Sequence, residues 1–272
     1  MYDLKPNAER TSMQTVILCG GLGTRLREET EYRPKPMVNI GTRPILWHIM
    51  KIYAFYGHIE FILPLGYKGN TIKDYFLHYE AMNNDLTLEL GRPESMHMHN
   101  CHEEAGWMIT LVNTGERTLK GGRLKRVESY ITDETFLLTY GDGVANVNIN
   151  ELLAFHQAHG KLATVTGVRP IARFGELEIQ DNSVISFQEK PQVTGKQGLI
   201  SGGFFVFQRE IFDYLTLDET CDLEHGPLER IAAAGELKVF RHEGFWYCMD
   251  TLRDMEALNR MWDQGRAEWK VW

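Results

Sequence analysis

The chain has 272 residues, of which 43% are hydrophobic and 24% are charged, as in an ordinary globular protein. That length suits one large domain with a well-buried core and is short for two full domains. The formal net charge of −8 argues against nucleic-acid backbone binding as the main task, because that task usually needs a basic face. It leaves room for a small anionic substrate held by a local group of Lys and Arg side chains.

The start of the chain and its cysteines bear on where the protein works. Residues 1–12 are polar and contain no apolar core segment, so we expect a flexible extension and no secretory signal, followed by a single domain over residues 13–272. No run approaches the ~18 apolar residues that span a bilayer, which argues against a membrane role. The widely spaced cysteines form no CxxC pair, which predicts reduced thiols in a cytoplasmic protein.

Strand and helix patterns alternate along most of the chain. Short apolar runs predict strands at residues 15–19, 60–65, 108–112, 135–140, 162–168, 204–207 and 237–240. Helices are predicted at residues 44–56, 71–82, 122–130, 149–159, 227–234 and 251–262, and a hairpin at residues 176–188. This alternation predicts an α/β fold, a Rossmann-like three-layer domain with a mostly parallel central sheet. In such sheets ligands bind outside the carboxyl ends of the strands.

A glycine-rich segment follows the first predicted strand directly. Gly20, Gly21 and Gly23 let backbone N–H groups approach an anion, and the Thr-Arg pair that follows adds a hydroxyl donor and a fixed positive charge. The segment is not a Walker A loop, and it fails GxGxxG because Leu26 takes the place of the last glycine. For the glycines alone, a tight turn between a strand and a helix is the alternative.

A stiff basic segment, Arg33-Pro34-Lys35-Pro36-Met37, comes soon after the glycine-rich loop. Its two prolines hold the backbone extended, so Lys35 projects at low entropic cost. A mobile surface lysine is the alternative. The loop glycines, Arg25 and Lys35 within one short stretch together predict a cradle for a triphosphate.

Two aspartates are candidates for holding a metal ion. Asp142 follows a predicted strand and has a glycine on each side, where a carboxylate can hold a hard cation such as Mg²⁺. An Asx turn is the alternative there. Asp250 stands just before the last predicted helix, where a helix N-cap or a first-turn carboxylate is the alternative.

GGLGTRL followed by PKPM resembles the signature of the sugar nucleotidyltransferases. The resemblance implies a nucleotide-diphospho-sugar transferase fold with Arg25 and Lys35 as catalytic residues that contact a nucleoside triphosphate. It also implies that Asp142 and Asp250 together hold Mg²⁺. The nucleotide-binding residues that it implies in these motifs are Leu18, Gly20, Gly21, Leu22, Gly23, Thr24, Arg25, Lys35, Gly141 and Asp142.

Two later motifs resemble the part of this family that binds the sugar phosphate. Glu189-Lys190-Pro191 resembles the family's Glu-Lys-Pro motif, which implies that Lys190 is a third catalytic residue and holds the sugar phosphate. An exposed turn salt bridge is the alternative. Gly202 and Gly203 resemble part of the sugar pocket, where close backbone packing at a strand start is the alternative. Gly175 completes the expected sugar-phosphate site.

Further stretches, among them GYKG at 66–69, TLKGGRLKR at 118–126 and DTLRD at 250–254, resemble the branch of the family that uses CTP and glucose 1-phosphate. By that resemblance Thr114, Gly121, Gly122 and Arg123 lie near the cytosine nucleotide. A basic helix start on a solvated face is the alternative for residues 122–126. We therefore expect CTP and a sugar 1-phosphate as partners, no nucleic acid and no membrane. The aromatic chain end and the apolar helices favour a homo-oligomer.

The residue types suit nucleotidyl transfer. A sugar-phosphate oxygen is already anionic at neutral pH, so the reaction needs positioning and charge stabilisation more than a strong base. A uridylyl- or thymidylyltransferase and a non-catalytic sugar-nucleotide-binding protein are the alternatives.

The cluster of His97, His99, Cys101 and His102 contains residue types that bind zinc. Its spacing rarely gives tetrahedral geometry, so we expect a surface or subunit-contact loop there.

Overall fold

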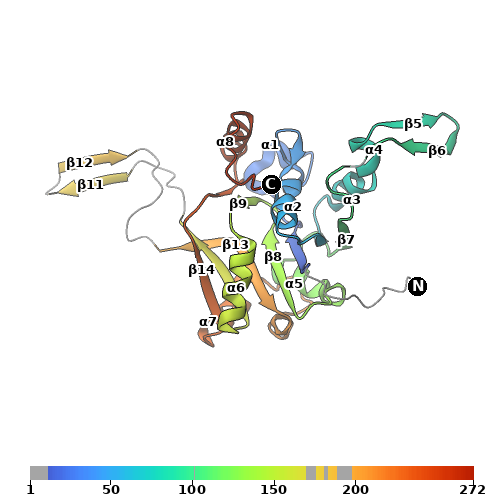
Figure 1. Cartoon of the computed structure of the whole chain (residues 1–272). Helices are drawn as coiled ribbons and strands as arrows, with labels where there is room; N and C mark the ends of the chain where they lie inside the picture. The colour runs from blue at the N-terminus through green and yellow to red at the C-terminus, as the bar shows by residue number, and fades with distance from the viewer. Residues whose placement is uncertain (1–11, 101, 170–175, 181–182, 189–197) are drawn as a thin grey trace.

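The computed structural model describes residues 12–100, 102–169, 176–180, 183–188 and 198–272. Its centre is a seven-stranded sheet with the strand order β14-β10-β13-β8-β1-β4-β7 (Figure 1). The strands are β1 (Gln14–Leu18), β4 (Glu60–Leu65), β7 (Met108–Asn113), β8 (Thr135–Tyr140), β10 (Ala163–Val168), β13 (Ile200–Gln208) and β14 (Leu237–His242). Only β13 runs antiparallel to its neighbours within this sheet. The prediction of a mostly parallel sheet is confirmed.

Alternate side chains of each strand build a separate core on each face of the sheet. Ile17 of β1 packs into one buried cluster, whereas its neighbours Val16 and Leu18 pack into the other. Phe204 and Phe205 of β13 divide in the same way, because successive side chains of a strand point to opposite faces. Burial on both faces explains why these strands read as continuous apolar runs in the sequence.

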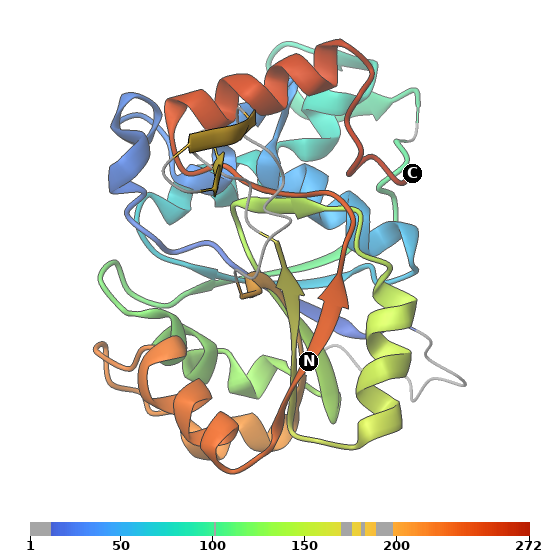
Figure 2. The ribbon, with the colours of Figure 1, turned by 90° about the vertical axis from the view of Figure 1, so that its left-hand side faces the viewer.

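Helices cover both of these cores. Leu152 of α6 (Ile149–His159) and Leu258 of α8 (Leu252–Asp263) are buried in the first cluster, as is much of α2 (Ile45–Phe55). The second cluster takes Leu124 from α5 (Lys120–Arg126) and Ile231 from α7 (Glu229–Ala233). The predicted three-layer α/β architecture is confirmed. In Figures 1 and 2, α8 crosses the end of the molecule toward which β8 points.

Two segments differ from the prediction. Residues 71–82 were expected to form one helix but form α3 (Gly69–Leu77) and α4 (Tyr79–Asn83), because His78 has a φ of −101° and a ψ of 6°. In the loop expected at His97, His99, Cys101 and His102, His97 instead lies in β6 (Arg92–Met98), which forms a hairpin with β5 (Leu86–Glu89), whereas His99 and His102 lie outside both strands and Cys101 lies outside the described residues. Gly91, with a φ of +87°, supplies the turn between these two strands.

The hairpin predicted at residues 176–188 consists of β11 (Glu176–Gln180) and β12 (Ser183–Gln188), and its turn lies outside the described residues. The two hairpins project from the body in opposite directions (Figure 1).

The helix predicted at 122–130 is α5 followed by a 3₁₀ turn, and the one at 227–234 is η5 followed by α7. The shorter elements are η1 (Thr24–Leu26), α1 (Arg27–Thr30), η2 (Lys35–Met37), β2 (Asn39–Ile40), β3 (Arg43–Pro44), η3 (Glu128–Tyr130), β9 (Gly143–Ala145), η4 (Arg209–Tyr214), η5 (Glu224–Leu228) and β15 (Trp246–Cys248). Among the described residues, the helices are all too short or too polar to cross a bilayer.

Candidate active site

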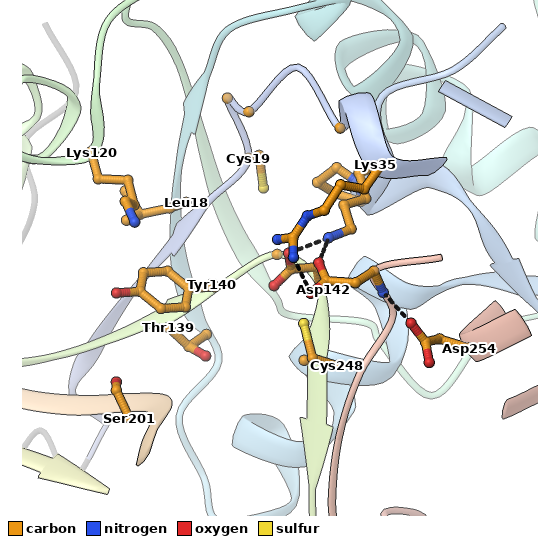
Figure 3. Close-up of a pocket in the computed structure, with 18 of the residues that line it drawn as sticks. Leu18, Cys19, Lys35, Lys120, Thr139, Tyr140, Asp142, Ser201, Cys248 and Asp254 are labelled. Carbon is orange, nitrogen blue, oxygen red and sulfur yellow. Dashed lines mark hydrogen bonds and ion pairs between the residues drawn. The ribbon is translucent and has the colours of Figure 1, made fainter. Parts of the chain in front are cut away.

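A pocket of ≈ 860 Å³ opens at the carboxyl ends of β1 and β8. Its walls come from the loop after β1, the end of β8, the start of α5, the start of β13 and the segment from β15 into α8. These segments lie far apart in the chain, and Figure 3 shows their side chains gathered around one space. The position agrees with the rule that open α/β sheets bind ligands outside the carboxyl ends of their strands.

The glycine-rich loop forms one wall of this pocket. Gly23 adopts a φ of +64°, and a Cβ there would lie 2.6 Å from a methyl group of Thr30, so a larger residue would be strained. Within the described chain, the N–H groups of Gly21, Leu22 and Gly23 donate to no other group. Backbone N–H groups in this state are available to an anion.

The buried side chain of Arg123 fixes the position of the glycine-rich loop. This side chain is 3% exposed, and its guanidinium donates to the carbonyl oxygen of Gly20 at 2.8 Å. It also donates to the hydroxyl of Thr114 at 2.9 Å and to the carbonyl oxygen of Leu65 at 3.1 Å. A Cβ on Gly20 would lie 2.1 Å from the guanidinium carbon. Arg123 therefore links α5 to β1 and β4, and only glycine fits above it.

The short antiparallel pair of β9 and β15 explains how two distant aspartates meet. Its register places Cys248 opposite Gly143, and the N–H of Met249 donates to the carbonyl oxygen of Asp142 at 2.9 Å. Asp142 comes just before β9 and Asp250 comes just after β15. Because antiparallel strands bring the start of one beside the end of the other, the two carboxylates face the same space.

Lys35 bridges these two carboxylates. Its ammonium nitrogen lies 2.7 Å from Oδ2 of Asp142 and 2.6 Å from Oδ1 of Asp250 (Figure 3). Arg25 adds a second cation, with its guanidinium 3.0 Å from Oδ2 of Asp250, and its side chain is 67% exposed. Four of the residues that the sequence predicted to bind phosphates or metal, namely Arg25, Lys35, Asp142 and Asp250, thus form one cluster of alternating charge.

The electrostatics of this cluster keep Lys35 charged. Burial alone would lower the pKa of the Lys35 ammonium, but the charge of Asp142 and the hydrogen bonds to both aspartates outweigh burial and raise that pKa above its ordinary value. Lys35 is therefore a permanent cation at physiological pH.

Asp250 is held in place by the start of α8. Thr251 is the N-cap of this helix, and with Asp254 it forms a capping box. The backbone N–H of Asp250 donates to Asp254 at 3.2 Å. The helix-cap alternative for Asp250 is therefore wrong: the cap is the next residue, which leaves the Asp250 carboxylate to Lys35 and Arg25.

A second charged group, which the motifs did not predict, lies at the other end of the pocket. Lys120 forms an ion pair with Glu224, and its ammonium lies 5.2 Å from the centre of the Tyr140 ring. The hydroxyl of Tyr140 donates to the same Glu224 oxygen at 2.5 Å. Burial, followed by the charge of Glu224, raises the pKa of Tyr140, so its hydroxyl stays protonated. Lys120 lies within the TLKGGRLKR stretch, but the sequence assigned it no role, and its pairing with Glu224 and Tyr140 is visible only in the structure.

The predicted residues fall into three groups by position. Those that line the pocket are Leu18, Gly20, Gly21, Gly23, Thr24, Arg25, Lys35, Arg123, Gly141, Asp142, Gly202 and Asp250. Those outside its lining are Leu22, Thr114, Gly121, Gly122 and Gly203. Gly175, Glu189 and Lys190 lie outside the described residues.

The residues outside the lining have visible structural roles. Thr114 is fully buried and donates to the carbonyl oxygen of Leu65 at 2.8 Å. Gly121 and Gly122 pack closely against the backbone of residues 218–222, and Gly203 lets its backbone approach the ring of Tyr140.

Known proteins resemble this chain in sequence and in fold. A family model described as nucleotidyl transferase matches residues 14–258, which is most of the chain. The chain belongs to this family. As a nucleotidyl transferase it is an enzyme, as the sequence motifs predicted.

Two members of the family resemble the chain over nearly all of its length. Glucose-1-phosphate cytidylyltransferase of Salmonella typhi is 50% identical over 261 residues, covering 96% of this chain and 100% of that protein. The protein of the same name from Salmonella typhimurium matches with the same identity and coverage. The crystal structure of HddC from Yersinia pseudotuberculosis superposes with a TM-score of 0.67 at 23% identity, covering 92% of this chain and 99% of that one. That last likeness shows the shared fold.

Proposed function

We propose that this nucleotidyl transferase transfers a cytidylyl group from CTP to α-D-glucose 1-phosphate and releases CDP-glucose and pyrophosphate. The two full-length relatives at 50% identity carry the name of that activity. In the structure, the observation that supports the proposal is the cluster of Arg25, Lys35, Asp142 and Asp250 at one end of the pocket. Such a cluster suits two anionic substrates and a divalent cation better than it suits a neutral ligand.

The reaction needs charge stabilisation more than proton transfer. An oxygen of the sugar phosphate attacks the α-phosphorus in line, and the bond from that phosphorus to pyrophosphate breaks as the new P–O bond forms. The main obstacles are the approach of two anions and the charge that develops on the leaving pyrophosphate. Arg25 and Lys35 would neutralise the triphosphate, and the free N–H groups of the glycine-rich loop would orient it. Lys190 would hold the sugar phosphate.

The residues present fit a magnesium ion. Mg²⁺ prefers hard oxygen ligands and is commonly held by one or two carboxylates together with substrate phosphates. Asp142 and Asp250, with a Lys35 ammonium between them, offer such carboxylates beside the phosphate-binding loop. When bound, the ion would stabilise charge on the phosphate oxygens. Lys35 would then be released from the carboxylates to contact the triphosphate.

The two ends of the pocket suggest how the substrates divide it. Gly202 and Ser201 at the start of β13 line the side of the pocket that we assign to the sugar phosphate. Gly175, Glu189 and Lys190, which lie outside the described residues, are expected to bind the same phosphate. Leu18 and Lys120 lie beside the glycine-rich loop, and we assign this side to the nucleoside. Leu22, Thr114, Gly121 and Gly122 would then support the nucleotide site from outside its lining.

The test is pyrophosphate release from glucose 1-phosphate and Mg²⁺ with each of CTP, UTP, dTTP, ATP and GTP. CTP is expected to give the highest kcat/KM. A preference for UTP or dTTP would replace the proposal with the corresponding uridylyl- or thymidylyltransferase. Tight CDP-glucose binding without pyrophosphate release from any nucleotide would indicate a non-catalytic binding protein.

We also infer that the enzyme works in the cytoplasm as a homo-oligomer. Cys19, Cys221 and Cys248 are free thiols, which suits a reducing compartment. Leu77 and Leu90 are 77% and 89% exposed on α3 and on the β5–β6 turn, where contact with a second copy would cover them. Light scattering of the purified chain tests this inference, and a monomer at micromolar concentration would contradict it.

A further inference from the structure

Cys248 lies at the pair of carboxylates proposed to hold magnesium. One ligand atom from each of Asp142, Cys248 and Asp250 lies within 4.8 Å of the other two. The β9–β15 register causes this, because it places Cys248 opposite the residue that follows Asp142. In Figure 3 the sulfur of Cys248 points toward Asp142. Among the described residues, this is the one group of three acidic, histidine or cysteine side chains close enough to hold an ion.

We propose that Cys248 is a third protein ligand at this site and that the site binds thiophilic divalent ions, such as Zn²⁺, Co²⁺ and Cd²⁺, as well as Mg²⁺. The inference rests on the proposed metal role of Asp142 and Asp250 and adds a residue and an ion class to it. As the metal–sulfur bond forms, the thiol gives its proton to solvent and the sulfur supplies the electron pair.

The chemistry of the ligand set supports this choice of ions. Mg²⁺ takes oxygen ligands and gains little from sulfur, whereas zinc is commonly bound by a mixture of sulfur, nitrogen and carboxylate ligands. Two carboxylate oxygens and one thiolate leave a fourth tetrahedral position open to water or to a phosphate oxygen. A site of three protein ligands with one open position is the arrangement of catalytic zinc sites. Cys248 therefore makes this site selective in a way that two aspartates alone would not.

Lys35 competes with any ion at this place. Its ammonium occupies the space between the carboxylates at 2.6 and 2.7 Å, so an ion must displace it before binding there. Without nucleotide the ammonium has no phosphate to move to, and it opposes the metal. Replacing Lys35 with Met should therefore tighten the binding of a metal ion alone, whereas a site elsewhere on the chain would not respond.

The test is a titration of the full chain with Co²⁺ in the absence of nucleotide and sugar phosphate. A cobalt ion bound to a thiolate gives an intense near-ultraviolet charge-transfer band, and we expect that band to saturate at one equivalent. Cys248→Ser should abolish the band, and Asp142→Asn, which keeps the thiol, should weaken Co²⁺ binding roughly 10-fold or more. Cys221→Ser is the matched control, because Cys221 packs against Gly121 outside the pocket, and it should keep the band.

Two outcomes would overturn the inference: no charge-transfer band in the unaltered chain, or a band that survives in Cys248→Ser. A Lys35→Met variant whose Co²⁺ affinity is unchanged would also contradict the location of the ion. Because the titration contains no substrate, its result is separate from that of the nucleotide comparison. An active cytidylyltransferase without the band would refute this inference alone, and a band in a chain that transfers no nucleotide would refute only the proposed reaction.

Discussion

The two ends of the reaction pocket balance charge in different ways. At one end Arg25 and Lys35 face Asp142 and Asp250. At the other end a single pair, Lys120 with Glu224, rests against the ring of Tyr140. At the first end, the two cations can leave the carboxylates and bind phosphate oxygens, and the carboxylates can then bind a metal ion. Each charged group therefore exchanges one oppositely charged partner for another. The second arrangement holds one cation in a fixed place, which suits recognition. We name these the carboxylate end and the lysine end.

The largest expected effect is at the carboxylate end. Asp142→Asn removes one of the two carboxylate charges proposed to hold Mg²⁺ while keeping the shape of the side chain. We expect kcat to fall about 10³-fold, as when a group that stabilises transition-state charge is lost. Initial-rate measurements of pyrophosphate release check this. Asp263→Asn, an exposed carboxylate near the end of α8, is the control and should keep normal turnover. Near-normal turnover in Asp142→Asn would remove the metal assignment.

The second-largest effect concerns Arg123, the buried side chain that holds the glycine-rich loop in place. Arg123→Met leaves the carbonyl oxygen of Gly20 without its donor and removes one of three donors to the carbonyl oxygen of Leu65. We expect the free energy of unfolding to fall by about 3 kcal/mol and the KM for nucleotide to rise, because buried acceptors lose their partners and the loop loosens. Urea denaturation and steady-state kinetics measure the two changes. Unchanged stability would mean that Arg123 does not hold the loop.

The contrast between the ends also separates what the sequence could predict from what it could not. Arg25 and Lys35 were found because they belong to continuous motifs, and the central strands were found because burial on both faces makes them apolar throughout. The strands β9 and β15 are three residues long each and gave no periodic signal, yet their register brings Asp142 to Asp250. The sequence identified both aspartates as candidate metal ligands. Their closeness in space depends on the long-range pairing of β9 with β15, which the sequence does not reveal.

The lysine end was not predicted for a related reason. Lys120 and Glu224 lie on elements 104 residues apart, and neither belongs to a phosphate-binding motif. For residues 122–126 the sequence left a basic helix start on a solvated face as the alternative, whereas Arg123 is buried and the N-terminus of α5 lines the pocket. The break in the helix at His78 and the β5–β6 hairpin were also not predicted, because both depend on local backbone geometry that residue propensities for helix and strand do not specify.

A smaller effect is expected at the lysine end. Lys120→Met should raise the KM for CTP about 10-fold, the cost of one lost hydrogen bond to a charged group, and leave kcat within a factor of a few. Lys125→Met is the matched control, because Lys125 lies on the same helix but contacts the carbonyl oxygen of Phe212 outside the pocket. A rise in the KM for glucose 1-phosphate instead would place the sugar at this end and reverse the proposed division of the pocket.

The smallest effect tests the helix cap behind the carboxylate end. Thr251→Ala removes the N-cap of α8 and should cost about 1 kcal/mol of stability. Asn148→Ala removes the N-cap of α6, no residue of which lines the pocket, and should cost a similar amount. Only Thr251→Ala should also lower kcat, because it loosens Asp250. Equal kinetics in the two variants would show that the cap stabilises the fold without positioning the carboxylate.

The central claim is that Asp142 and Asp250 act as one unit, and a double-mutant cycle on kcat tests it most directly. Asp142→Asn, Asp250→Asn and the double variant are compared under saturating CTP, glucose 1-phosphate and Mg²⁺. If both carboxylates hold the same ion, the double variant should be about as slow as the slower single variant, because the unit is already lost. If the two losses in kcat multiply, the carboxylates act independently and the shared catalytic centre is contradicted.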